Sequence, residues 1–125
     1  MRLSIAFIAL VLVTASAVAQ PRGQSFSGAL TRNAPRASFE LELQPGQVVT
    51  LTTSSTTGLD TVLALNGPNG RRVAENDDVQ PGVLTSRVVY VARAAGRHTA
   101  VITGYNGATG AFELDVAYGL DVGLS

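Results

Sequence analysis

The stretch from Leu59 to Asp78, LDTVLALNGPNGRRVAENDD, carries the strongest folding signal in this chain. Its centre, residues 66–70, holds two Asn-Gly pairs around a proline, and these residue types tolerate the backbone angles of a tight reversal. Alternating apolar residues flank the centre on both sides, so the stretch predicts a β-hairpin. If the turn centres between Pro68 and Asn69, the register places Asp60 opposite Asp77.

This hairpin would gather oxygen-bearing side chains at its far end, from Asp60, Asn76, Asp77 and Asp78. Two interpretations stand. The four side chains can accept backbone N–H bonds and stabilise loop turns, as Asx residues commonly do. Alternatively they can coordinate Ca²⁺, which prefers six to eight oxygen ligands. Calcium is the one cofactor that the sequence brings into consideration, although the spacing does not match an EF-hand loop.

Short alternating segments recur along the rest of the chain, and turn residues separate them. No helical period is found after residue 20. Eight strands in so short a chain predict an all-β fold of two packed antiparallel sheets, and a barrel with the same number of strands is the alternative. The expected strands are Ser25–Thr31, Ser38–Leu43, Gln47–Thr53, Asp60–Asn66, Arg71–Asn76, Thr85–Ala92, Arg97–Tyr105 and Ala111–Tyr118.

The alternation also predicts which side chains form the core. In Ser38–Leu43, for example, the apolar residues share one face and the glutamates Glu40 and Glu42 share the other. The same reasoning along every strand predicts an inward set of Phe39, Leu41, Leu43, Val49, Leu51, Leu63, Leu65, Val73, Val88, Tyr90, Ala100, Ile102, Phe112, Leu114 and Val116.

Residues 1–19 are typical of a secretory signal peptide: Arg2 precedes an apolar run, and Ala17-Val18-Ala19 matches a cleavage site. An uncleaved membrane anchor is the rival interpretation, and the shortness of the run argues against it. Cleavage leaves eight arginines against nine acidic residues, a net charge of −1, which favours neither nucleic acid nor an anionic membrane as partner. The chain has no Cys, so disulfides are excluded.

Several motifs, in this order, resemble the bacterial pre-peptidase C-terminal domain, which is found behind secreted peptidases and also alone. They are Pro45-Gly46-Gln47, Leu59–Leu65, Gly67-Pro68-Asn69-Gly70, Asn76-Asp77-Asp78, Ser86–Tyr90, Ala95–His98 and Thr109–Leu114. The resemblance runs from about Gly28 to Val116, and it departs at His98, where the family usually carries Tyr. It implies a secreted, non-catalytic, eight-stranded antiparallel β-sandwich of jelly-roll type, and some members bind calcium or extracellular polymers.

The expected organisation is therefore a signal peptide (1–19), a lead-in (20–27), the sandwich domain (28–118) and a C-terminal tail (119–125). Enzymatic activity is not expected. His98 is the only histidine, it falls on the predicted inward face of a strand, and neither a Zn²⁺ ligand set nor a phosphate-binding loop accompanies it.

A ligand or partner surface is predicted from exposed apolar positions. Val89, Val91 and Val101 lie on the outward register of their strands, and Tyr105 precedes an Asn-Gly turn. The predicted function is that of a binding or accessory module in the periplasm, cell envelope or extracellular space, with an extracellular polymer or an exported protein as partner. The alternative is a periplasmic peptidase inhibitor or chaperone-like factor that acts through a sheet edge or loop.

Overall fold

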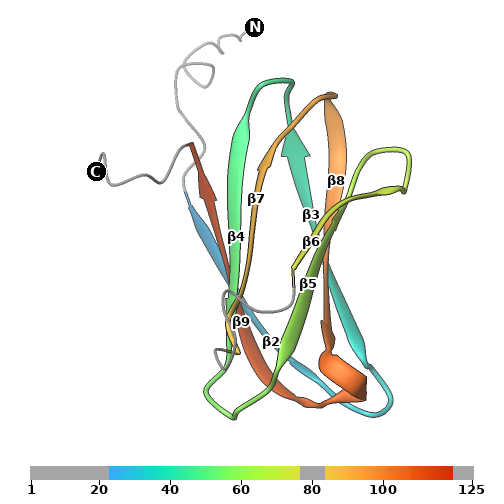
Figure 1. The fold of residues 1–125 in the computed structure, drawn as a ribbon, viewed down its shortest axis with the longest axis vertical. Helices are drawn as coiled ribbons and strands as arrows, with labels where there is room; N and C mark the ends of the chain where they lie inside the picture. The colour runs from blue at the N-terminus through green and yellow to red at the C-terminus, as the bar shows by residue number, and fades with distance from the viewer. Residues whose placement is uncertain (1–22, 77–83, 120–125) are drawn as a thin grey trace, which may run out of the picture.

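The computed structural model describes residues 23–76 and 84–119, which form an elongated β-sandwich (Figure 1). A single turn of 3₁₀-helix, η1 (Tyr105–Gly107), interrupts the strands. No helix among the described residues is long and apolar enough to cross a membrane. The strands are β2 (Gln24–Leu30), β3 (Arg36–Leu43), β4 (Val48–Ser54), β5 (Thr61–Asn66), β6 (Arg72–Asn76), β7 (Ser86–Val91), β8 (Gly96–Gly104) and β9 (Gly110–Tyr118).

The strands divide equally between two four-stranded sheets. Their orders are β2-β9-β4-β7 and β3-β8-β5-β6, and every described pair is antiparallel. Consecutive strands therefore alternate between sheets except at the β5–β6 hairpin, which is the jelly-roll arrangement. The sheets do not join into a closed barrel, so the predicted sandwich is confirmed and the barrel alternative is wrong.

The core lies between the two sheets and follows the predicted alternation. Fourteen of the fifteen predicted inward residues are buried in it or, like Phe39 and Tyr90, pack against it. The ring of Phe39 lies 4.9 Å from that of Phe26 and 6.1 Å from that of Phe112, so aromatic packing joins β3 to the other sheet. The pattern missed Leu30, Leu59 and Ala92, which lie at or beyond strand ends, where alternation carries no information.

The β5–β6 turn forms where the Asn-Gly pairs predicted it. Gly67 N–H donates to the Arg71 carbonyl at 2.8 Å, and Gly70 N–H donates to the Gly67 carbonyl at 2.9 Å. Gly70 has a φ of 83°, a left-handed conformation that favours glycine. The side-chain oxygen of Asn69 accepts the Arg71 N–H at 2.9 Å, which fixes the last corner of the turn.

The register of this hairpin differs from the predicted one by two residues. Leu63 pairs with Asn76 rather than with Ala74. The turn accounts for one residue of this difference, since Asn66 pairs with Arg72, and a bulge after Leu65 accounts for the other and sets Val73 outside the regular ladder. Val73 is consequently 38% exposed, and its predicted place in the core was wrong. Turn residues locate a reversal, but they do not show how many residues the turn and bulge consume.

Candidate functional site

The predicted acidic cluster lies partly outside the described residues. Asp77 and Asp78 lie outside the described residues. Asp60 immediately precedes β5, and Asn76 is the last residue of β6. The Asp60 carbonyl accepts the Tyr105 N–H at 2.8 Å, while the buried Oδ1 of Asp60 has no hydrogen-bond partner among the described residues. Within residues 23–76 and 84–119, no three His, Cys, Asp or Glu side chains come together as a metal site would require.

His98 is a core residue, as its strand position predicted. Its side chain is 1% exposed, and its ring lies 6.0 Å from the ring of Tyr90. Nδ1 is 3.0 Å from the Gly96 carbonyl, so Nδ1 carries a hydrogen that it donates to this oxygen. No described hydroxyl or carboxylate hydrogen-bonds to this imidazole, which leaves it without the partners of a catalytic triad.

The predicted surface residues fall on opposite sides of the sandwich. Val89 and Val91 are 57% and 52% exposed on β7, an edge strand of the β2-β9-β4-β7 sheet. Val101 lies on β8 in the other sheet, and it is only 4% exposed, so its assignment to an exposed apolar patch was wrong. Val101 does point outward, but neighbouring side chains cover it on the central part of the sheet. Tyr105 is 52% exposed at one end of this second sheet.

The outer surface of the β3-β8-β5-β6 sheet, which we term the polar face, carries polar side chains on all four of its strands. Strand pairing arranges its outward residues in rows across the sheet. The first row is Arg36, Thr103 and Val62; the second is Ser38, Val101, Ala64 and Glu75; the third is Glu40, Thr99, Asn66 and Arg72.

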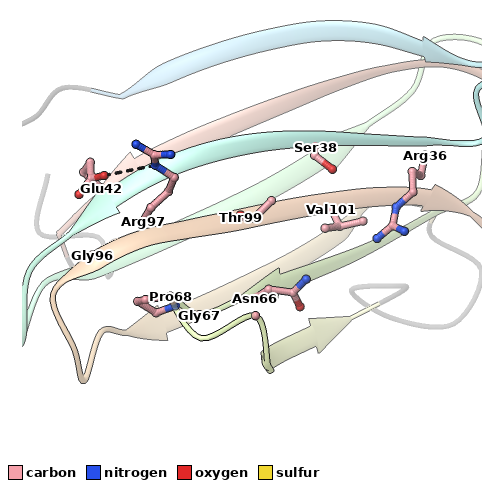
Figure 2. Close-up of a pocket in the computed structure, with 11 residues that line it drawn as sticks. Arg36, Ser38, Glu42, Asn66, Gly67, Pro68, Gly96, Arg97, Thr99 and Val101 are labelled. Atoms are coloured by element: carbon pink, nitrogen blue, oxygen red, sulfur yellow. Dashed lines mark ion pairs between the residues drawn. The ribbon is translucent and has the colours of Figure 1, made fainter.

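A hollow of about 520 Å³ lies on the polar face, between β3 and the β5–β6 turn (Figure 2). Arg36, Ser38, Thr99 and Asn66 line it, and Val101 lies among them. In Figure 2 the Arg36 side chain reaches from β3 across β8 toward Val101, so its guanidinium lies over the middle of the sheet. The hollow therefore combines hydrogen-bond donors with an apolar base.

Two of the arginines around this hollow have carboxylate partners. Arg97 Nε lies 3.6 Å from Glu40 and 3.6 Å from Glu42, and Figure 2 marks the second of these ion pairs. Arg72 lies 3.3 Å from Glu75, and its Nε donates to Asn66 Oδ1 at 3.3 Å. These pairs are largely exposed, so they hold the side chains in place more than they stabilise the fold.

A second hollow, of about 610 Å³, lies on the same sheet and is lined by Val62, Glu75, Asn76 and Tyr105. Val62 also belongs to the first row of the polar face, together with Arg36, so the two hollows border the same row of the sheet. Tyr105 is held by its N–H bond to Asp60 and by Asn106, whose φ of 54° turns the chain sharply after it. The tyrosine ring is thus presented at one end of the polar face.

Reasoning from the sequence did not find the polar face as a site. The alternation in β3 does place Arg36 and Ser38 on the outward side, together with Glu40 and Glu42. It does not show that β8 and β5 lie beside them, because that neighbourhood depends on strand order. Only Val101 and Tyr105 among the predicted surface residues belong to this side of the molecule.

No protein-family model matches the chain, and no curated protein matches it either. Solved structures do match. The pre-peptidase C-terminal domain of a collagenase from Bacillus anthracis is similar with a TM-score of 0.63 at 13% identity, over 76% of this chain and 89% of that domain. PliG of Aeromonas hydrophila, a periplasmic inhibitor of g-type lysozyme, is similar with a TM-score of 0.61 at 14% identity, over 78% of this chain and 87% of that one. At these identities the likeness concerns the fold alone: the chain has the fold of the pre-peptidase C-terminal domain, as its motifs predicted.

Proposed function

We propose that the mature chain is an exported, non-catalytic binding module whose binding surface is the polar face. The observation that carries this proposal is the pair of hollows on one sheet, with Arg36, Ser38, Asn66 and Thr99 in one and Tyr105 in the other. Mixed donors beside an exposed aromatic ring suit recognition of a polymer at an otherwise rigid sheet. The buried position of the only histidine supports a role without catalysis.

Export is a separate part of this proposal, and its support is the signal-like pattern of residues 1–19. N-terminal sequencing of the protein recovered from outside the cytoplasm should begin at Gln20. Recovery of the chain with Met1 intact in the membrane fraction would contradict export of a cleaved module and favour the anchor interpretation.

The binding surface can be tested by co-sedimentation of residues 20–125 with insoluble cell-envelope material. Ser38→Trp would fill the hollow that Arg36 lines from an exposed position, so we expect it to abolish retention while the melting midpoint stays near that of the wild type. Ser27→Trp places the same side chain at an exposed position on β2, in the other sheet, and should leave retention intact. Equal retention of both variants would exclude the polar face as the binding surface.

A second candidate is an inhibitor or chaperone-like factor that binds an exported enzyme through the edge of β7. Two observations favour it: Val89 and Val91 are exposed on an edge strand, and the fold is shared with a lysozyme inhibitor. A pull-down from an envelope extract separates the candidates. Recovery of one stoichiometric enzyme that is lost in Val89→Asp, but kept in Ser38→Trp, would favour the inhibitor.

A further inference from the structure

Resting on the proposed function, we infer that the polar face binds a glycan whose sugars carry carboxylate groups, and that Arg36 binds the carboxylate. The argument begins with charge. Arg72 and Arg97 are paired with glutamates on this face, whereas Arg36 has no ion-pair partner in residues 23–76 and 84–119. Its guanidinium therefore keeps its donors available, in a planar fork that matches a carboxylate.

The groups around Arg36 complete the recognition of a sugar. Ser38 lies two residues along the same face of β3, and Thr103 lies opposite Arg36 on β8. Because Asn66 Oδ1 already accepts from Arg72, the amide nitrogen of Asn66 is the part left to donate. Val101 gives the hollow an apolar base: it is 4% exposed, and the equally buried Ala64 lies beside it in the same row. Hydroxyl groups, C–H surfaces and one carboxylate of a sugar would each meet a matching group.

The arrangement of charge also limits how densely the ligand can be charged. Exposed Glu42 lines the hollow, and Glu40 and Glu75 lie elsewhere on the same face. Arg36 is the guanidinium in the hollow that has no ion pair within the described residues. A polyanion with a charge on every small unit would bring its anions against these glutamates and be repelled. A glycan spaces its carboxylates a sugar ring apart. One carboxylate can therefore reach Arg36 while neutral hydroxyl groups lie beside the glutamates, which do not repel them.

A peptide fits this surface less well than a glycan. The hollow lies over β8, whose backbone is hydrogen-bonded to β3 on one side and to β5 on the other. An extended peptide lying here could not add to the sheet, so its N–H and C=O groups would lose water without regular partners. The exposed ring of Tyr105 in the second hollow instead offers a flat surface for stacking a sugar.

The proposal is tested by isothermal titration of residues 20–125 with defined oligosaccharides at low ionic strength. Two probes present the two natural sources of a sugar carboxylate: a tetragalacturonate, and the disaccharide of N-acetylglucosamine and N-acetylmuramic acid. The methyl ester of each probe keeps its shape and removes its charge. We expect at least one free acid to bind, and its ester to bind weaker by about tenfold or more.

Arg36→Gln should weaken binding of the acid by about the same factor and leave the ester unaffected. Arg93→Gln removes the same charge from an exposed position that does not line the hollow, and it should bind like the wild type. Equal affinity for acid and ester, or equal affinity of the two variants, would overturn the assignment to Arg36. Binding of gelatin peptides in place of either glycan would overturn the glycan class.

The co-sedimentation experiment distinguishes failure of this inference from failure of the proposed function. If neither glycan binds, the inference is overturned. The polar face then still stands as a binding surface if Ser38→Trp abolishes envelope retention and Ser27→Trp does not. If Ser38→Trp and Ser27→Trp are also retained equally, the proposed function is contradicted as well.

Discussion

The hydroxyl oxygens of Thr53 and Thr61 lie 2.6 Å apart in the interior, one from each sheet, near the end of β4 and the start of β5. Both side chains are fully buried. Ser86 joins them: its hydroxyl oxygen lies 3.1 Å from that of Thr61, and it donates to the Thr61 carbonyl at 2.6 Å. Polar groups in an apolar core are stable only when each finds a partner, so these contacts constrain how the two sheets dock.

Thr61→Val should therefore destabilise the fold by about 1–3 kcal/mol, because it keeps the side-chain volume and removes the hydroxyl that the buried Thr53 and Ser86 hydroxyls contact. Urea unfolding measures the loss. Thr52→Val is the matched control, since Thr52 is half-buried on the outward side of β4 and makes no described side-chain hydrogen bond; a change within about 0.5 kcal/mol is expected there. Equal losses in the two variants would contradict a role for the buried hydroxyls.

Gly70→Val should cost about 1–2 kcal/mol, because Gly70 has a φ of 83° and a β-branched side chain disfavours this conformation. Apart from the two adjacent residues, no described residue has an atom within 4 Å of a Cβ built on Gly70, so the loss would arise from backbone conformation and not from a clash. Gly70→Asn should lose less, since Asn tolerates a left-handed backbone. A melting midpoint of Gly70→Val equal to that of the wild type would show that the turn can be rebuilt at no cost.

For calcium, we expect the melting midpoint of the wild type to be the same in excess Ca²⁺ and in chelator. A bound ion would stabilise the folded state by about 2.7 kcal/mol at one hundred times its Kd, which a melt would detect. Asp77→Asn should then destabilise equally in both conditions, because Asn keeps one acceptor oxygen for backbone N–H groups. A lower midpoint in chelator, lost in Asp77→Asn, would instead establish the acidic cluster as a calcium site.

Alkaline pH should weaken the fold through Tyr118, at the end of β9. Burial raises the pKa of this phenol above its ordinary value of 10.0, because the interior disfavours the charged form. The unfolded chain then releases the Tyr118 proton at lower pH than the folded chain. Its contribution is fully present below pH 10.0 and is lost as pH rises through the higher pKa of the folded state.

Urea unfolding at a series of pH values above neutrality measures this effect, and Tyr118→Phe is the control. The variant cannot ionise at this position, so its stability should fall less steeply above pH 10.0 than that of the wild type. If the free energy of unfolding of the two proteins falls equally with pH, the loss of stability at alkaline pH arises from groups other than Tyr118.

The positions of the strands and the inward or outward direction of their side chains could be predicted from the sequence, because both depend on local residue patterns. Side chains alternate across a strand with a period of two, so Leu41 and Leu43 had to share a face that excludes Glu40 and Glu42. Glycine and Asn-Gly pairs located the reversals for a similarly local reason, as Gly70 shows. The error at Val73 arose where a bulge broke that period within the hairpin.

The candidate site depended on which strands become neighbours, and residue order alone does not state this. Arg36 and Thr103 face each other across β3 and β8 although most of the domain separates them in the chain. Val89 and Val101 have similar local patterns, yet the jelly-roll order places them in different sheets, one exposed at an edge and the other covered at the centre. Local alternation determines which way a side chain points, whereas the pairing of distant strands, driven by burial of the whole core, determines what lies beside it.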